Sequence, residues 1–338
     1  MKSAAVVLCQ NTHVPERSYF IVGGLGFIGS HFADVLLADP ATRRVTAYDN
    51  LSSGQRWHVE HHGDDQRFTT VAADVTDHER LLEAMRDHDI VIHLASNPDI
   101  ARAATEPAID FTAGTLLTHH VIEAARQSGV EEVLYASGSG VYGELGEVEA
   151  YEDYGPLIPV STYGASKLAG EALLASYCYM FGLRGRVFRF GNVVGPRQTH
   201  GVGYDFVRRL GEDPTKLRIL GDGQQSKSYI HVHDVMRAVL LASHKETKAF
   251  NVFNVATGDY ATVTEIADLA VKCKGLDPSA VTFEYTGGDR GWKGDVPVVR
   301  LNCDRIRALG WRCQLSTLAA LESSIRSMIA DESRGPSK

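Results

Sequence analysis

The sequence predicts an α/β protein built on a doubly wound parallel sheet, followed by a smaller C-terminal α/β part. Short β-rich runs that are apolar on both faces alternate with longer helical patterns, as in a sheet that helices cover on both sides. A length of 338 residues and a hydrophobic fraction of 44% suffice for a large core. Glycine- and proline-rich loops follow Phe190, so we expect one domain over residues 18–190 and another mainly over 191–330, with some later segments crossing back.

The expected elements follow from runs of β-branched and aromatic residues and from helical spacing of apolar residues. The strands are Tyr19–Val22, Val45–Tyr48, Phe68–Ala72, Ile90–Leu94, Glu132–Ala136 and Gly185–Phe190. The helices between them are Ile28–Leu37, Glu79–Met85, Ala108–Arg126 and Tyr163–Phe181. In the C-terminal part we expect one helix from near Thr262 and a last helix after Ser316.

Composition excludes several classes of protein. A formal net charge of −8 and a pI near 6.0 argue against a nucleic acid as the main partner. No stretch has the apolar length of a membrane span. The five cysteines form no C-x-x-C pair and no disulfide framework, which fits a reducing cytoplasm best.

A glycine-rich turn follows the first expected strand. Gly23, Gly26 and Gly29 occupy a strand-to-helix junction, where glycine permits close approach of a pyrophosphate and the helix N-terminus offers free N–H groups. Asp49 ends the second strand 20 residues after Gly29, placed for an adenosine ribose. An acid there repels a 2′-phosphate, so the pattern favours NAD over NADP and a Rossmann domain.

The ends of the later strands supply further candidates for the cofactor site. Asp74 follows the third strand and could approach the adenine, although a role as helix N-cap is equally consistent with its position. The full set of expected cofactor contacts is Gly23, Gly26, Phe27, Ile28, Gly29, Asp49, Asn50, Asp74, Val75, Leu94, Ala95, Tyr163 and Lys167.

Tyr163 and Lys167 are the candidate pair for proton transfer. They stand four residues apart and share one helix face, so the ammonium can lie near the phenol and lower its pKa. A phenolate of this kind can take a proton from a hydroxyl.

These motifs together resemble the extended short-chain dehydrogenases/reductases, and within them the nucleotide-sugar epimerases of the UDP-glucose 4-epimerase type. The resemblance covers residues 18 to about 325 and rests on the glycine turn, Asp49-Asn50-Leu51, Val141-Tyr142-Gly143 and the Tyr163–Lys167 pair. Further similar segments are Gly191–Arg197, Tyr229–Asp234 and Gly294–Pro297, which correspond to the substrate-binding segments of the family.

The resemblance implies 4-epimerisation of a UDP-sugar through a transient 4-keto intermediate, with NAD regenerated in each cycle. Tyr163 would take the proton of the sugar 4-hydroxyl, and Lys167 would hold the phenolate and the nicotinamide ribose. Another nucleotide-sugar-modifying enzyme of the same family, such as a UDP-glucuronate or UDP-N-acetylglucosamine epimerase, a dehydratase or a reductase, remains an alternative. A catalytically silent NAD-binding sensor is a more remote one.

The end of the fifth strand departs from the common family pattern. Gly138 stands where many relatives place the serine or threonine that hydrogen-bonds the reacting hydroxyl, so either Ser137 or Ser139 is expected to replace it. Sugar-nucleotide 4,6-dehydratases carry an Asp-Glu pair where this chain has Ser139 and Gly140, which disfavours dehydration.

The resemblance also implies a set of substrate-binding residues and a homodimer formed by the helices 108–126 and 163–181. The substrate set is Ser139, Tyr163, Asn192, Arg197, Lys227, Arg290 and Val299. We expect no metal site, because His231-Val232-His233-Asp234 lacks a third ligand at recognisable spacing. The pairs His61-His62 and His119-His120 are interpreted as surface residues.

Overall fold

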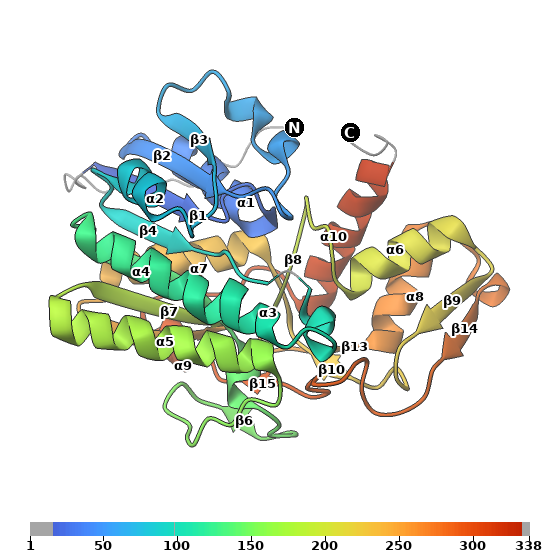
Figure 1. Cartoon of the computed structure of the whole chain (residues 1–338). Coiled ribbons are helices and arrows are strands. Elements are labelled where there is room, and N and C mark those ends of the chain that lie inside the picture. Colours follow the sequence, from blue (N-terminus) through green and yellow to red (C-terminus); the bar gives the residue numbers. More distant parts are fainter. Residues whose placement is uncertain (1–15, 98, 333–338) are drawn as a thin grey trace.

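A seven-stranded parallel sheet forms the centre of the molecule (Figure 1). The computed structural model describes residues 16–97 and 99–332. The strands run in the order β12-β7-β5-β4-β1-β2-β3, and every neighbouring pair is parallel. Their bounds are Arg17–Val22 (β1), Thr42–Asp49 (β2), Phe68–Ala72 (β3), Ile90–His93 (β4), Glu132–Gly138 (β5), Arg184–Phe190 (β7) and Phe250–Val255 (β12). This doubly wound sheet confirms the predicted fold class.

The seventh strand comes from the C-terminal half of the chain. β12 pairs with β7 in parallel register, from Phe250 opposite Gly185 to Val255 opposite Phe190. Helix α7 precedes it and packs against α1. A segment that follows the change of pattern at Phe190 therefore returns to the main sheet.

Helices cover both faces of the sheet, with α2, α4 and α5 on one face and α1 and α7 on the other (Figure 1). The helices are Phe27–Ala38 (α1), His78–Met85 (α2), Ala108–Asp110 (α3), Leu117–Gln127 (α4), Thr162–Phe181 (α5), Val202–Glu212 (α6), Val232–Lys245 (α7), Val263–Cys273 (α8), Asp304–Ala308 (α9) and Thr317–Glu332 (α10). A π-helical turn, Phe111–Leu116, joins α3 to α4. Short 3₁₀ turns are η1 (Arg56–His58), η2 (Glu60–His62), η3 (Ile100–Ala104), η5 (Ser139–Tyr142) and η6 (Pro278–Ala280).

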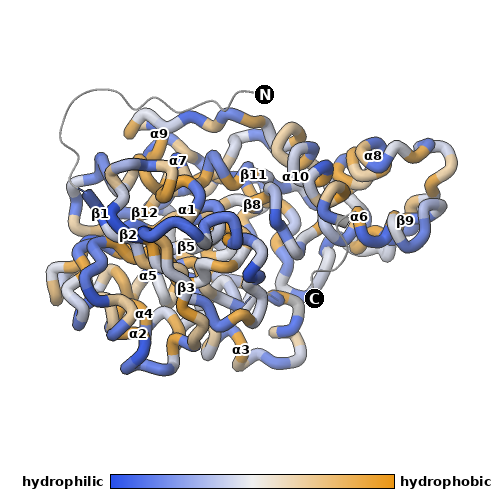
Figure 2. The backbone as a smooth tube through the Cα atoms, turned by 90° about the horizontal axis from the view of Figure 1, so that it is seen from above, coloured by the Kyte–Doolittle hydropathy of each residue, from blue (hydrophilic) through white to orange (hydrophobic). Residues whose placement is uncertain are grey.

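Successive side chains of a strand point to opposite faces, and this alternation fills two separate cores. Phe20 and Val22 of β1 pack with the residues under α2, α4 and α5, whereas Ile21 between them packs under α1 and α7. Figure 2 shows the hydrophobic segments gathered around the central strands and the hydrophilic ones along the outer loops. Both faces of the sheet are thus buried, as the sequence predicts.

The C-terminal lobe has a core of its own. Helices α6, α8 and α10 pack around Phe206, Leu217 and Ile266. The small strand pairs that complete the structure are β9 (Lys216–Ile219) with β14 (Thr282–Tyr285), β8 (Asn192–Val194) with β11 (Tyr229–His231), β10 (Ser226–Lys227) with β13 (Ala261–Thr262) and β6 (Glu149–Ala150) with β15 (Arg300–Leu301). None of the helices in the described part of the chain has the length and apolarity needed to cross a bilayer.

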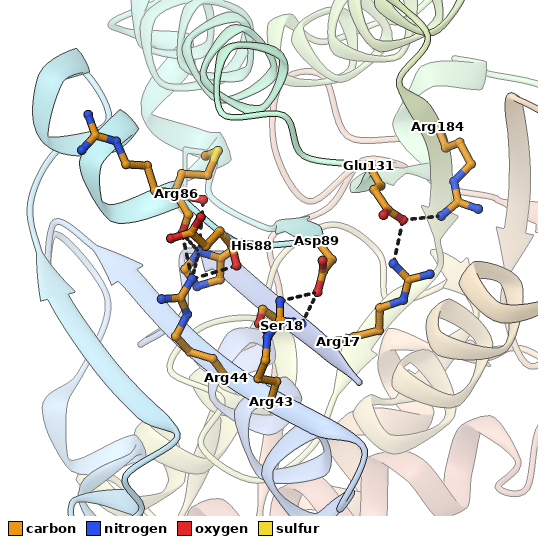
Figure 3. A network of polar contacts seen from close by, with 11 residues as sticks. Arg17, Ser18, Arg43, Arg44, Arg86, His88, Asp89, Glu131 and Arg184 are labelled. Atoms are coloured by element: carbon orange, nitrogen blue, oxygen red, sulfur yellow. Dashed lines mark hydrogen bonds and ion pairs between the residues drawn. The ribbon is translucent and has the colours of Figure 1, made fainter. Parts of the chain in front are cut away.

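The amino-terminal edge of the sheet is held by a polar network (Figure 3). Asp89, before β4, accepts a hydrogen bond from the backbone N–H of Ser18 at 2.6 Å. Glu131, before β5, pairs with Arg17 at 2.6 Å and with Arg184 at 3.5 Å. These contacts join the starts of β1, β4, β5 and β7, while the carboxyl ends of the same strands lie at the opposite edge, where open α/β sheets bind ligands.

Candidate functional site

A single cavity of about 740 Å³ lies along the carboxyl ends of the strands. It extends from the turn after β1 to the loops of the C-terminal lobe, so its walls include Gly26, Tyr163 and Lys227. The volume is within the range of about 300–1,000 Å³ that is usual for ligand pockets.

The glycine turn at one end of the cavity is shaped for close contact with a ligand. Gly23 has φ +82°, and a Cβ on Gly29 would stand 2.2 Å from the carbonyl oxygen of Gly23. Helix α1 begins after Gly26 without a side-chain cap, so its first N–H groups remain available to an anion. Phe27, Ile28 and Gly29 of this first turn line the cavity. The glycine turn and the start of α1 together fit the pyrophosphate of a dinucleotide.

Asp49 stands at the end of β2 with its carboxylate fixed by the backbone. It accepts hydrogen bonds from the N–H groups of Leu25 at 3.0 Å and Leu51 at 2.8 Å. Burial raises its pKa, which these two bonds oppose. Gly54 packs against the carboxylate so closely that a Cβ would meet it at 2.6 Å. Asp49 lines the cavity, as expected for a ribose-binding acid.

Asp74 is not brought to the cavity, although its neighbour Val75 is. Its carboxylate accepts from Asn50 Nδ2 at 2.8 Å and from the Thr76 backbone at 2.9 Å. The N-cap of α2 is Asp77. Asp74 therefore orients the cavity-lining Asn50 and is neither the helix cap nor a wall residue. Leu94 and Ala95, after β4, do line the cavity.

Tyr163 and Lys167 both line the cavity from the first turns of α5. Ser161 caps this helix, since its hydroxyl accepts from the Gly164 N–H at 3.1 Å. Lys167 Nζ donates to the carbonyl oxygen of Ala136 at 2.8 Å and lies 5.6 Å from the centre of the Tyr163 ring. Burial lowers the pKa of Lys167 to about 8, with Glu171 acting in the opposite sense.

The pKa of Tyr163 differs from the sequence-based expectation. Burial raises it, and a hydrogen bond with the side chain of Ser96 acts in the opposite direction. The expected lowering of the Tyr163 pKa is not found for the polypeptide alone, because loss of hydration is the largest effect and the charge of Asp110 also raises the pKa. Ser96 lines the cavity and gives no signal in the sequence.

The two candidate serines have different environments. Ser137 Oγ donates to Glu171 Oε1 at 2.6 Å, and Glu171 pairs with Arg189 at 2.7 Å in a buried network. Ser139 lines the cavity and, among the described residues, makes no side-chain hydrogen bond. A Cβ on Gly138 would meet nothing within 4 Å, so open space lies between the two serines.

A buried acid anchors the start of the helix that carries Tyr163. Asp110, which is 1% exposed, accepts from Thr162 Oγ1 at 2.6 Å and from Asn97 Nδ2 at 2.8 Å. The bonds join the loop after β4 to the first residue of α5 through Asp110. Sequence reasoning missed this tie because its three members are separated by 13 and 52 positions.

At the other end of the cavity, Asn192, Lys227 and Val299, which are candidates for substrate binding, are wall residues. Lys227 Nζ pairs with Asp295 at 2.5 Å and lies 5.0 Å from the centre of the Trp292 ring. Trp292, like Arg209, lines the cavity without having been predicted.

Two predicted arginines do not line the cavity. Arg290 donates to both carboxylate oxygens of Glu144, at 2.7 and 2.9 Å, and to the Asp295 carbonyl at 3.0 Å. Arg197 donates to Asp34 Oδ2 at 2.7 Å, on the outer side of α1. In both cases a carboxylate distant in the sequence binds the guanidinium, which is the physical reason why neither arginine lines the cavity.

One of the histidines is placed differently from the expectation. In the segment 231–234, Asp234 accepts hydrogen bonds from Arg237 and from the Gln314 backbone. His62 is not a plain surface residue, because its side chain is 15% exposed and bonded to Asp34. The described cysteines Cys178, Cys273, Cys303 and Cys313 are free, and Cys9 lies outside the described residues.

Comparison with known proteins agrees with this geometry. A family model described as the NAD dependent epimerase/dehydratase family matches residues 19–256. The chain therefore belongs to the NAD-dependent epimerase/dehydratase family, and NAD is its cofactor.

Individual relatives include epimerases and dehydratases. A UDP-glucose 4-epimerase of Mycolicibacterium smegmatis is 31% identical over 312 residues, covering 90% of this chain and 96% of the relative. The crystal structure of a UDP-galactose 4-epimerase has a TM-score of 0.81 and 33% identity, covering 93% of this chain and 99% of that one. The dTDP-glucose 4,6-dehydratase of Streptomyces venezuelae, solved with NAD, has a TM-score of 0.85 and 28% identity, covering 94% and 98%.

Proposed function

We propose that this protein is a UDP-sugar 4-epimerase that works through a transient 4-keto sugar. The observation that carries the proposal is the position of Tyr163 and Lys167 in the middle of one cavity. The glycine turn and Asp49 lie at one end of that cavity, and Lys227 and Asn192 lie at the other. A sugar nucleotide whose phosphates lie near Lys227 can present its sugar to Tyr163 and to the cofactor together.

Each residue has a definite task in this reaction. The Tyr163 phenolate, which Lys167 stabilises, accepts the proton of the sugar 4-hydroxyl and becomes the neutral phenol. Ser139 hydrogen-bonds the same hydroxyl, because it faces the cavity and has no competing partner among the described residues. NAD⁺, when bound, supplies the hydride acceptor and a positive charge that favours the phenolate. The keto sugar turns over in the cavity and regains hydrogen on its other face, so no net oxidation occurs.

Dehydration is the second reaction to consider, because dehydratases are among the relatives. Expulsion of water needs an acid and a base beside Tyr163. The acidic residues that line the cavity in the described chain are Asp49, Asp205 and Asp295, and none belongs to the end of β5. Ser139 and Gly140 occupy that position, and neither can transfer the required protons. We therefore favour epimerisation.

The test is incubation of the purified protein with UDP-, GDP-, CDP- and TDP-sugars without added cofactor. The expected product has unchanged mass and is inverted at C4 by NMR. Loss of 18 mass units would support dehydration, and absence of product from every donor would refute the proposal. Tyr163→Phe should lower kcat by about 10²–10⁴-fold while NAD binding persists.

We also propose that the protein acts in the cytoplasm as a homodimer. Support for the dimer comes from the outer end of α5, where Tyr179 is 77% exposed, Met180 71% and Phe181 48%. Phe111, which begins the π-helical turn before α4, is 60% exposed. Helices α4 and α5 pack side by side on one face of the molecule, so a second copy could cover these side chains (Figure 1).

A further inference from the structure

Asp34, His61 and His62 converge outside the cavity described above. Asp34 lies on α1, and the two histidines form the end of η2, in the connection between β2 and β3. His61 Nε2 lies 2.8 Å and His62 Nε2 2.7 Å from the same oxygen, Asp34 Oδ1. One ligand atom of each residue lies within 4.8 Å of the others.

The donor set has a definite chemistry. Two imidazole nitrogens and one carboxylate oxygen suit Zn²⁺, which takes nitrogen at about 2.0–2.1 Å and oxygen at about 2.0–2.2 Å in tetrahedral geometry. Ligand atoms at those distances are roughly 3.3 Å apart around the metal, so the present separations need to widen by only about half an ångström. His61 is 49% exposed, which leaves room for water at the fourth position. Neutral imidazole is the form that binds, and Nε2 offers its lone pair to the metal when the single ring proton is on Nδ1.

The second carboxylate oxygen of Asp34, Oδ2, is held by other residues. Arg197 Nη2 donates to Asp34 Oδ2 at 2.7 Å, and His31 Nδ1 lies 3.6 Å from that oxygen. Hydrogen bonds of this kind hold a ligating carboxylate in position, and here they leave Oδ1 directed toward the two histidines. The guanidinium lies on the side of the carboxylate away from the histidine pair, so it orients the ligand without occupying the site.

We propose that Asp34, His61 and His62 bind one divalent transition metal ion, with Zn²⁺ as the best fit. The ion links two segments near the cofactor end of the cavity, α1 and η2, and Arg197 joins a third segment to the same carboxylate. Helix α1 begins at the glycine turn, and η2 follows a segment in which His58 Nδ1 contacts the Leu25 carbonyl at 2.8 Å. Arg197 precedes the cavity-lining Gln198 in the loop between β8 and α6. The metal ion stabilises the segments that surround the adenosine end of the site and takes no part in the sugar chemistry.

The test measures metal binding on the full chain without a polyhistidine tag. Metal is first removed with a chelator, Zn²⁺ is titrated against a chromogenic chelator, and bound zinc is counted by mass spectrometry after desalting. Wild type should hold one equivalent, whereas the His61→Ala/His62→Ala double variant and Asp34→Asn should bind roughly tenfold more weakly or worse. Co²⁺ should give the visible bands of a tetrahedral nitrogen and oxygen site in wild type only.

The matched control is the other adjacent histidine pair, on α4. His119 and His120 have ring centres 5.9 Å apart and belong to no metal-binding group in the described chain. The His119→Ala/His120→Ala variant should bind Zn²⁺ like wild type. Equal binding by the His61/His62 variant, or less than one equivalent in wild type, would overturn the proposal. Thermal unfolding of the metal-free variants separates loss of the site from loss of the fold.

Discussion

Ser137 and Ser139 lie two residues apart and are expected to respond differently to substitution. Ser137→Ala removes the hydrogen bond to Glu171 in a buried network, which costs about 1–2 kcal/mol of unfolding free energy and leaves kcat nearly unchanged. Ser139→Ala removes the hydroxyl that faces the cavity, so kcat should fall by roughly tenfold or more while stability is retained. Steady-state kinetics and urea unfolding of both variants check the prediction.

A rescue experiment tests the same assignment. Gly138 has extended backbone, φ −157°, and open space where its Cβ would stand. Gly138→Ser in the Ser139→Ala background should restore part of kcat, because it places a hydroxyl at the usual family position. A Ser137→Ala variant with the larger loss of kcat would contradict the assignment of Ser139.

Lys167 is predicted to lower the free energy of unfolding at neutral pH although turnover requires it. Burial lowers its pKa to about 8, below the ordinary 10.5, so the unfolded chain holds the proton more tightly than the folded one. The resulting penalty is complete below pH 8 and disappears as the pH rises from 8 to 10.5. Lys167→Met should therefore raise the unfolding free energy by about 2 kcal/mol at pH 7, after allowing for the lost bond to Ala136, and abolish turnover.

Urea unfolding of both proteins at pH 7 and pH 10 measures this effect. The excess in unfolding free energy of the methionine variant over wild type should shrink toward zero at the higher pH. A variant less stable than wild type at pH 7 would show that the bonds of the ammonium outweigh its desolvation.

At the scale of elements, α5 functions only if its first turn is held in place. Asp110→Ala leaves Thr162 and Asn97 without their acceptor, which should cost about 1–3 kcal/mol of unfolding free energy and lower kcat as the start of α5 shifts. Thr112→Ala, on the exposed face of the π-helical turn, is the matched control. Lower stability with an unchanged kcat would remove Asp110 from its positioning role.

Elements with local signals could be predicted from the sequence. The six strands up to Phe190 and the helices between them follow from apolar runs and helical spacing, and each is found close to its expected range. β12 was missed because Asn251 and Asn254 interrupt its apolar pattern. Asn254 is nevertheless fully buried, since it exchanges hydrogen bonds with the Tyr142 hydroxyl and the Ala150 carbonyl. Such compensation depends on tertiary contacts that a single sequence does not reveal.

Tertiary contacts also limit how much of the candidate site can be predicted from the sequence. The glycine turn, Asp49 and the Tyr163–Lys167 pair could be chosen as candidates because each is a short motif with its own chemistry, and all of them line the cavity. The partners of Arg197 and Arg290 were not, since Asp34 and Glu144 lie 163 and 146 positions away. Asp34 likewise joins His61 and His62 across 27 and 28 positions, which is why spacing gave no indication of a metal site.

At the scale of the whole molecule, the exposed apolar end of α5 predicts dimerisation. Met180→Glu combined with Tyr179→Ser places charge and polarity on the proposed interface, so the protein should sediment as a monomer at concentrations where wild type is a dimer. Leu318→Glu, at a 45% exposed position on α10, should leave the dimer intact. A monomeric wild type, or an unaffected double variant, would contradict an interface at α5.

The proposed binding of the cofactor and the sugar nucleotide in one cavity also predicts an internal transfer of hydrogen, and an isotope experiment tests it most directly. The UDP-sugar that turns over is supplied with deuterium at C4 and incubated with the purified protein in ordinary water without added cofactor, and the product is examined by mass spectrometry and NMR. The account predicts the C4 epimer of that sugar with the deuterium retained at C4, because the hydride passes to the bound cofactor and returns from it. Loss of the deuterium to solvent, or a product that has lost water, would contradict it.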